Sequence, residues 1–304
     1  MPAMECGGEH QTVLRAEAVE LLQPARRRVL VDCTVGLGGH SEALLAQAGS
    51  ETVLIGIDVD EDNLVKAKQR LAPYAGRVRM FRANFDQLDA VLAEAALGPA
   101  DAVLADLGVA SSQLDDPARG LSFLSDGPLD MRLDRERTVT AADLVNHLGE
   151  KELADLIYLN GEERYSRRIA KAIVTARTRG RISRTGELAQ IVSSAYPAPA
   201  RRARHGVHPA TRTFQALRIA VNDELGCLDR LLALLPKALS AGGRAAIISF
   251  HSLEDRRVKQ AFANLAAEGR ATVLTRKPVT PGPREIEENP RSRSAKLRGM
   301  EKIG

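Results

Sequence analysis

Short apolar runs alternate with amphipathic stretches along the first third of this chain. The apolar runs predict buried strands, and the stretches with apolar positions three and four residues apart predict helices. Strands are expected at 28–35, 52–59, 78–83 and 102–107, and helices at 10–27, 40–48, 61–71 and 87–96. This alternation favours an α/β fold with a parallel sheet and right-handed crossover connections.

The pattern changes after residue 113. Residues 114–139 are rich in Asp, Arg, Gly and Pro and are expected to form loops, and no strand pattern follows for about a hundred residues. Helices are expected there at 140–148, 151–159, 163–179 and 187–196, with a hinge-like exit at 197–205. We therefore predict a helical insertion domain at 114–215 within a sheet domain made of residues 10–113 and 216–304.

Alternation resumes in the last third of the chain. Helices are expected at 212–224, 228–239 and 254–268, and strands at 244–250, 272–276 and 295–303. A turn is expected at Gly242-Gly243, and the proline-rich stretch 278–290 is expected to be a loop.

Composition is that of a soluble protein of one large domain or two modest ones. The chain has 304 residues, of which 44% are hydrophobic and only 3% aromatic, so aliphatic side chains must fill the core. Its three cysteines, Cys6, Cys33 and Cys227, do not have the spacing of a metal site or a disulfide framework. No apolar run approaches the roughly 20 residues of a membrane helix, and the first ten residues do not resemble a secretory signal. We expect a cytoplasmic protein with reduced thiols.

Positive charge is concentrated in one part of the chain. The net charge is only +4, yet residues 164–218 hold thirteen Lys and Arg residues against one acid, Glu187. The rest of the chain is therefore net negative. Such polarity indicates a polyanionic partner such as nucleic acid, although a solvated basic helical face would show the same run.

A glycine-rich turn, Gly36-Leu-Gly38-Gly39-His40, follows the first predicted strand. Glycines let the backbone approach a ligand closely, and the helix amino end that follows favours carboxylate or other oxygen-rich groups. The third glycine of the dinucleotide-binding fingerprint is replaced here by Ser41. An amino-acid-like ligand is thus favoured over a pyrophosphate, with a plain tight turn as the alternative.

Asp58 ends the second predicted strand, 19 positions after Gly39. A carboxylate in this place accepts hydrogen bonds from ribose hydroxyls in nucleotide-binding sheets, although it also suits the N-cap of the helix at 61–71. Phe85 follows the third strand, where its ring would flank a purine or simply join the core. Glycine turn and carboxylate together predict a site for an adenosine-containing cofactor.

Asp106 ends the fourth predicted strand, at the centre of the proposed cleft. A buried carboxylate is costly unless it is paired or used, so a cationic ligand is a plausible partner. Ser111 and Gln113 follow closely and offer further donors and acceptors.

Two segments near the end of the basic region and beyond it carry further polar candidates. On a helix starting near residue 211, Thr211, Gln215, Arg218 and Asn222 share one face, which suits phosphate and base contacts or a solvated surface. His251 follows the strand at 244–250 and would face the same cleft, where we expect it to position substrate. No serine-nucleophile motif or metal-ligand cluster accompanies His251, and no metal is expected.

Five of these stretches together resemble the bacterial MraW family. They lie at 32–41, 106–116, 208–224, 249–256 and 289–298, in the order of the family, and the resemblance spans about residues 10–303. Members of that family are S-adenosylmethionine-dependent methyltransferases of the cytosine N4 amine in small-subunit (16S) ribosomal RNA. The resemblance implies a class I, Rossmann-like methyltransferase sheet with an inserted all-helical domain that recognises substrate.

The resemblance also assigns residues. It implies a cofactor site lined by Gly38, Gly39, His40, Asp58, Phe85, Asp106 and Gln113. Asp106 is also the expected catalytic residue, either accepting hydrogen bonds from the N4 amine or balancing the charge of the cofactor. We expect the RNA to contact Arg201, Arg202, Arg204, Arg212, Gln215, Arg218, Asn222 and His251. The turn after the fourth strand reads Asp-Leu-Gly, unlike the Asp-Pro-Pro-aromatic turn of many amino methyltransferases, so their mode of amine activation does not transfer.

Three other functions fit parts of this pattern. The missing third glycine argues against a nicotinamide-dependent oxidoreductase, and the basic insert argues against a methyltransferase of small molecules. Intact site positions argue against an RNA-binding module with an inactive cofactor site. The sequence does not decide between free RNA and an assembled small subunit as substrate, or between a monomer and a homodimer.

Overall fold

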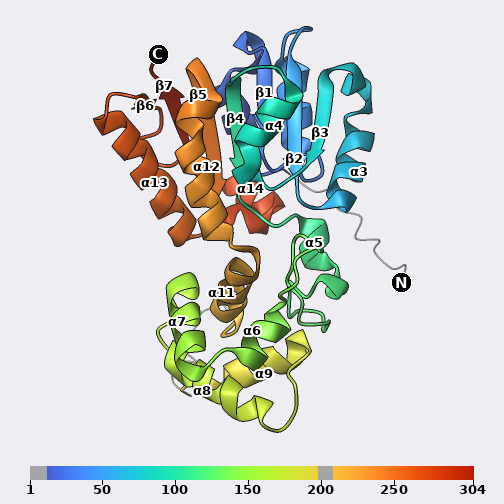
Figure 1. Ribbon diagram of the computed structural model, residues 1–304, viewed down its shortest axis with the longest axis vertical. Coiled ribbons are helices and arrows are strands. Elements are labelled where there is room, and N and C mark those ends of the chain that lie inside the picture. Colours follow the sequence, from blue (N-terminus) through green and yellow to red (C-terminus); the bar gives the residue numbers. More distant parts are fainter. Residues whose placement is uncertain (1–11, 198–207) are drawn as a thin grey trace. The chain divides into compact units, whose positions relative to one another are not determined.

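The computed structural model describes residues 12–197 and 208–304, which form two compact units (Figure 1). The first unit extends to Gly108 and resumes at Gly226, and the second is Val109–Leu225. The second unit is therefore slightly longer at both ends than the insertion expected at 114–215. Leu217 and Val221 belong to its hydrophobic core and Val109 packs against it, which explains why these flanking segments fold with it.

The first unit contains a seven-stranded sheet with the order β3-β2-β1-β4-β5-β7-β6. The strands from β1 to β5 pair in parallel, whereas β7 is antiparallel to both β5 and β6. Their bounds are β1 Val29–Asp32, β2 Val53–Asp58, β3 Val78–Arg82, β4 Ala100–Asp106, β5 Leu239–Ser249, β6 Ala271–Val273 and β7 Lys296–Lys302. The order of the parallel strands is that of a doubly wound Rossmann sheet. The predicted Rossmann-like sheet with a helical insertion is confirmed.

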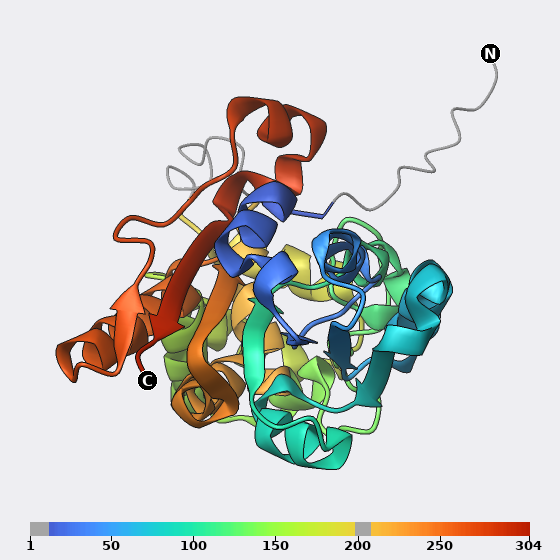
Figure 2. The same ribbon diagram turned by 90° about the horizontal axis from the view of Figure 1, so that it is seen from above.

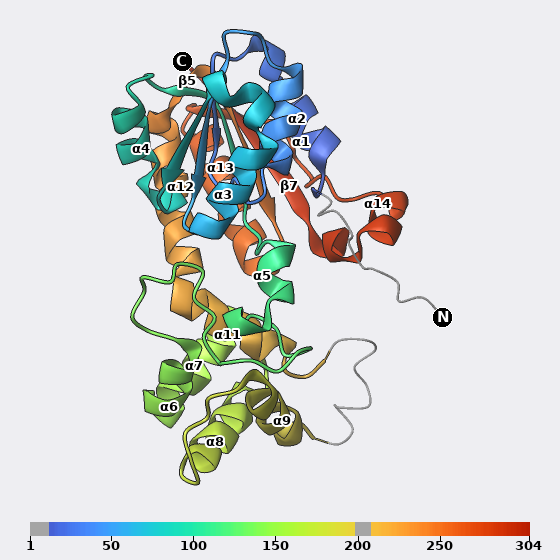
Figure 3. The ribbon, with the colours of Figure 1, turned by 90° about the vertical axis from the view of Figure 1, so that its right-hand side faces the viewer.

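Helices cover both faces of this sheet (Figures 2 and 3). Leu30, Leu104 and Ile248 point toward α1 and α2 in one core cluster, while their neighbours Val31 and Val103 belong to the cluster on the opposite face. The helices of the first unit are α1 Arg15–Leu22, α2 Gly39–Gln47, α3 Glu61–Arg70, α4 Leu88–Ala95, α12 Glu224–Ala238, α13 Ser252–Ala267 and α14 Pro283–Glu288. The first two residues of α12 belong to the second unit. Because successive strand residues alternate between faces, the continuous apolar runs of the sequence are those of strands buried on both sides.

Two local expectations in the last third were wrong. The turn expected at Gly242-Gly243 lies inside β5, where the register shifts between Ala100 and Ala102 of β4. A side chain at Gly243 would come within 2.8 Å of the Ser240 carbonyl oxygen, so only glycine allows this irregular stretch to stay in the sheet. The loop expected at 278–290 contains the short helix α14, which begins with a proline in its first turn.

The second unit is helical and has a hydrophobic core of its own. Its helices are α5 Ser111–Asp115, α6 Ala141–His147, α7 Glu150–Gly161, α8 Ser166–Arg177, α9 Thr185–Ala195 and α11 Thr211–Asn222. Thr140 caps α6 as its spacing to Asp143 predicts, with reciprocal hydrogen bonds of 3.2 Å and 3.0 Å. The hinge expected at 197–205 falls almost entirely outside the described residues. Among the described residues, no helix has the length and apolarity needed to cross a membrane.

Candidate active site

Three carboxylates lie at the carboxyl ends of three adjacent strands in the first unit. Asp58 ends β2, Asp32 ends β1 and Asp106 ends β4. Two residues before Asp32 and Asp106 are Leu30 and Leu104, both in the cluster beneath α1 and α2. Because side chains on a strand alternate with a period of two, the carboxylates lie on that same face, just beyond the apolar core.

The glycine turn that connects β1 to α2 is bonded to the end of β2. Gly36 and Gly38 have φ angles of 51° and 81°, a backbone conformation that glycine adopts without strain. The Gly36 amide donates to Asp58 Oδ2 at 2.9 Å, and the Val35 amide donates to the Ile57 carbonyl at 2.9 Å. The turn and Asp58 therefore form one rigid edge of the site.

Asp58 is a half-buried acceptor and does not cap a helix. The N-cap of α3 is Asp60, whose side chain accepts from the Asp62 amide, so the alternative that Asp58 caps this helix is wrong. Asp58 accepts hydrogen bonds from Gly36, from the Asp60 amide at 2.8 Å and from Asn63 Nδ2 at 3.3 Å. Burial raises the pKa of Asp58 to about 6, against the opposing effect of these hydrogen bonds.

His40 brings α2 to the two central carboxylates. Its side chain is buried, and Nε2 lies 3.5 Å from Asp106 Oδ2. Asp32 is fully buried and accepts from Ser41 Oγ at 2.7 Å. Burial raises the pKa of Asp32, while the nearby charge of His40 lowers it. Thr34 joins the network, because its Oγ1 accepts the Asp106 amide at 2.7 Å.

Several polar atoms of this cluster have no hydrogen-bond partner within residues 12–197 and 208–304. They are Nδ1 and Nε2 of His40 and Oδ1 of Asp106, all buried. Buried polar atoms in native proteins are nearly always hydrogen-bonded, because leaving one unpaired costs about 1–3 kcal/mol. The cluster is therefore built for a polar ligand that enters at the carboxyl edge of the sheet.

Phe85 is placed on the far side of Asp58 from this cluster, after β3. It begins a short 3-10 helix, Phe85–Gln87, which Asn84 and Gln87 cap reciprocally. Its ring is half-buried and packs against the core cluster under α4 and α12. Both readings of the sequence, a core residue and a ligand-flanking ring, are compatible with this partial exposure.

Comparisons with known proteins identify the family of this chain. The model of the MraW methylase family matches residues 7–303. The chain belongs to the MraW methylase family. This is a family of S-adenosylmethionine-dependent methyltransferases.

Relatives match the chain over nearly its whole length. A protein from Syntrophobacter fumaroxidans is 48% identical over 97% of this chain and 97% of its own length. One from Symbiobacterium thermophilum is 48% identical over 97% and 96%, and one from Geobacter sulfurreducens is 47% identical over 97% and 99%. All three are named Ribosomal RNA small subunit methyltransferase H.

Two solved structures are similar to this chain at low sequence identity. An rRNA methylase from Streptococcus thermophilus has 11% identity and a TM-score of 0.42 over 98% of this chain and 100% of its own. TrmN from Thermus thermophilus has 14% identity and a TM-score of 0.44 over 95% of this chain and 48% of its own. Similarity at this level carries no weight for function.

The positions that the sequence resemblance assigns to a cofactor site lie mainly in the first unit, and their role in cofactor binding stays a prediction. The structure gathers Gly38, His40, Asp58 and Asp106 at one edge of the sheet, as the strand pattern predicts. Gln113 belongs to the second unit, where it lies in the first turn of α5 and its Oε1 accepts the Ala110 amide at 3.0 Å. Its contribution to cofactor binding stays a prediction.

The helix expected to carry the polar face is α11, and its polar residues have partners within the second unit. Arg218 forms a bidentate ion pair with Glu224 at 2.8 Å and 2.9 Å. Asn222 is buried and bonds the Leu133 amide and the Met131 carbonyl, both at 2.8 Å. Asn222 therefore holds the loop before α6 in place. The expectation that this residue lies on a solvated or RNA-facing surface does not fit its burial.

The other predicted RNA contacts are placed unevenly. Arg212 donates to the Glu162 carbonyl at 2.8 Å, and Gln215 is half-buried on α11. Arg201, Arg202 and Arg204 lie outside the described residues. Their roles in substrate binding stay predictions.

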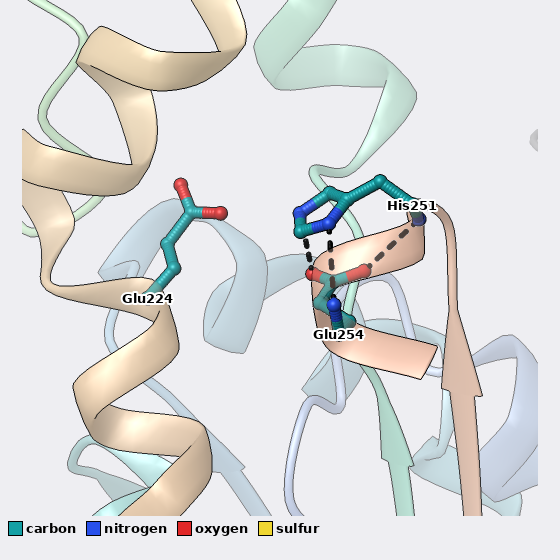
Figure 4. Close-up of side chains that lie close together, drawn as sticks. All are labelled: Glu224, His251 and Glu254. Atoms are coloured by element: carbon teal, nitrogen blue, oxygen red, sulfur yellow. Dashed lines mark hydrogen bonds and ion pairs between the residues drawn. The ribbon is translucent and has the colours of Figure 1, made fainter. Parts of the chain in front are cut away.

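His251 has a structural role that the sequence analysis missed (Figure 4). It is the N-cap of α13, and its Nδ1 accepts the Glu254 amide at 3.4 Å. Glu254 is buried, and its Oε2 accepts the amides of Phe250 and His251 at 2.9 Å and 3.3 Å. A capping residue followed three positions later by Glu is the signal that predicts this arrangement.

Gly38→Ala is expected to weaken cofactor binding and also to lower the stability of the folded protein. A side chain at a φ of 81° costs about 1–2 kcal/mol, and its Cβ would also lie 3.4 Å from Ala67 Cα. We expect a roughly tenfold higher Kd for S-adenosylhomocysteine by calorimetry and a Tm lower by roughly 2–6 °C. Gly76→Ala is the matched control, because nothing lies within 4 Å of its Cβ. Equal effects of the two substitutions would contradict the role of the turn.

Proposed function

We propose that this protein transfers a methyl group from S-adenosylmethionine to the N4 amine of a specific cytidine in small-subunit (16S) ribosomal RNA. The observation that carries the proposal is the cluster of Asp32, His40 and Asp106, with unpaired buried polar atoms, in a chain of the MraW methylase family. The names of its relatives support the RNA class, and the resemblance of the sequence supports the N4 atom.

Residues at the carboxyl edge of the sheet suit the ribose, the adenine and the methionine part of the cofactor. The Asp58 carboxylate accepts three hydrogen bonds from the protein, which leaves about one of its four acceptor positions for a ribose hydroxyl. Phe85 offers an apolar ring for the adenine. The amino end of α2, with Gly38 as its N-cap, favours the carboxylate of the methionine part. His40 and Asp106 have buried atoms that a polar cofactor would satisfy.

When bound, S-adenosylmethionine would supply a methyl group on a sulfonium: as the new N4–carbon bond forms, the carbon–sulfur bond breaks and the neutral thioether S-adenosylhomocysteine leaves. The proton that N4 loses would pass to solvent along its hydrogen bond to Asp106. The cytosine N4 is a poor nucleophile because its lone pair is delocalised into the ring. Asp106 accepts a hydrogen bond from the N4 amine and holds the nitrogen in line with the methyl group. Most of the rate enhancement then comes from positioning two reactants, which lowers the entropic part of the barrier.

Exposed basic side chains of the second unit supply a surface for the RNA backbone. Arg168 and Lys171 of α8 are exposed and line an open hollow of about 430 Å³ with Ala172 and Ala195. Arg168 also donates to the Ala195 carbonyl at the end of α9, at 3.1 Å, which fixes its position. Arginine and lysine side chains held in this way suit phosphate contacts, which position RNA without reading its sequence.

Charge reversal at Arg201, Arg202 and Arg204 is expected to weaken binding to small-subunit RNA. Each lost phosphate contact also lowers the slope of log affinity against log salt by about 1. Binding is measured by filter retention between 50 and 200 mM salt, about the range in which such contacts are resolved. The control reverses three exposed lysines of the first unit, Lys66, Lys68 and Lys259. Similar losses in both triple variants would mean that only net charge matters.

The proposed substrate class is tested by methyl transfer to ribosomal particles. Purified protein is incubated with labelled S-adenosylmethionine and with small or large subunits from cells that lack this methyltransferase. We expect label in the RNA of small subunits alone. Label in large subunits, or tight cofactor binding without any transfer to RNA, would contradict the proposal.

A further inference from the structure

The end of β5 lies beside Asp106 and carries an aromatic side chain. Asp106 pairs with Ile248 in the sheet, and the Leu107 amide donates to the Ile248 carbonyl at 2.9 Å. Phe250 follows Ile248 by two positions and packs against the same core cluster. Phe250 therefore lies on the face of the sheet that carries Asp106.

The turn after β4 has no side chain where the ring of Phe250 lies. A Cβ at Gly108 would come within 3.0 Å of Cε2 of Phe250 and within 3.5 Å of Cδ2 and Cζ. Glycine at position 108 therefore lets the ring rest against the backbone two residues after Asp106. The ring remains half-buried, so part of it is open to a ligand.

The position of Phe250 is fixed by its backbone. Its amide donates to Oε2 of the buried Glu254, and Glu254 is in turn held by its capping arrangement with His251. A ring on a fixed backbone loses little conformational freedom when a ligand stacks on it, which favours binding.

We propose that Phe250 is the residue on which the target base stacks during methyl transfer. Along the sheet order β2-β1-β4-β5, the site presents Asp58, Asp32, Asp106 and then Phe250 on one face. The cofactor spans the first three, so the next position along this edge is the place for its reaction partner. Bases of RNA are held for chemistry in an unpaired state, where stacking on an aromatic ring replaces stacking on neighbouring bases. The inference rests on the proposed function and names the residue through which the same site binds the target base.

The chain has no tryptophan, so one substitution creates a specific optical probe. In Phe250→Trp, the single indole would stack on the bound base, and its fluorescence would be quenched. We expect saturable quenching by cytidine 5′-monophosphate in the presence of S-adenosylhomocysteine. Tyr74→Trp is the control, because Tyr74 is also half-buried. It precedes β3, which is an edge strand and is separated from β5 by three strands. Absence of saturable quenching in a folded Phe250→Trp protein, or equal quenching in both variants, would overturn the inference.

Kinetics test the same inference without the larger ring. Stacking of one base on an aromatic side chain corresponds to about 5- to 150-fold in affinity. We expect Phe250→Ala to lower kcat/KM for small subunits by a factor in that range, while Phe250→Tyr retains most of the activity. The Kd for S-adenosylhomocysteine should not change, whereas a merely structural role would weaken cofactor binding and lower the Tm as well. Normal kcat/KM in a Phe250→Ala protein would overturn the inference.

Failure of the stacking role and failure of the proposed function give different experimental results. If the unmodified protein labels cytidine in small subunits but Phe250→Ala is fully active, the stacking role alone is wrong. If the unmodified protein labels no RNA, the proposed function is wrong, and the quenching measurement still decides whether a pyrimidine binds at Phe250.

Discussion

Asp106→Asn is expected to lower the rate of methyl transfer, at saturating cofactor and RNA, by about 100- to 1,000-fold. The amide keeps the size of the side chain and removes its negative charge, which lies 3.5 Å from His40 and which the proposed mechanism directs at the N4 amine of the target base. Because the amide fills the same space as the carboxylate, we expect the Tm to change little. Single-turnover transfer to small subunits measures the effect without interference from product release.

A matched substitution separates chemistry from general electrostatics. Asp89→Asn removes the same charge from the exposed surface of α4 and should leave the rate unchanged. Measuring the Kd for S-adenosylmethionine in Asp106→Asn then divides the loss between cofactor binding and amine positioning. A normal rate in Asp106→Asn would remove Asp106 from both roles.

Cofactor affinity is expected to fall about tenfold between pH 7 and pH 5 because of Asp58. Burial raises the pKa of Asp58 to about 6, so its carboxyl group takes up a proton within this range. The protonated group is a weaker acceptor for the ribose hydroxyls. Calorimetric titration with S-adenosylhomocysteine at several pH values measures the change. Asp58→Asn should bind roughly 100-fold more weakly at pH 8 and lose this part of the pH dependence.

Stability of the ligand-free protein should respond in the opposite direction. A carboxyl group whose pKa is higher in the folded state than in the unfolded chain contributes stability at low pH, and that contribution is lost as pH rises through about 6. The Tm of Asp58→Asn minus the Tm of the unmodified protein should therefore be more positive at pH 8 than at pH 4. The same pH dependence of cofactor affinity in both proteins would contradict the assignment to Asp58.

The parts of the site that lie in single strands could be predicted from the sequence. Asp58 and Asp106 end the strands observed, because an apolar run long enough for a buried strand stops where a polar residue meets the edge of the sheet. The glycine turn could also be predicted, since positive φ angles such as those of Gly36 and Gly38 favour residues without a Cβ. The helical insertion followed from the absence of any alternating or continuous apolar strand pattern.

Features that depend on partners far apart in the chain could not be predicted. The antiparallel direction of β7 follows from its pairing with β5, about 50 residues away in sequence. The buried role of Asn222 depends on the backbone of Met131 and Leu133, 91 and 89 positions earlier. The contact of Phe250 with Gly108 joins two strand ends in the same way. Local patterns report which residues form strands and helices, and they do not report which backbone groups these residues will meet.

The identity of the methylated atom tests the central claim most directly. Small-subunit RNA labelled by the purified protein and methyl-labelled S-adenosylmethionine is digested to nucleosides, which are separated by chromatography against synthetic standards. The account predicts that the label elutes with N4-methylcytidine. Label in 5-methylcytidine, in a ribose-methylated nucleoside or in a methylated purine would contradict it.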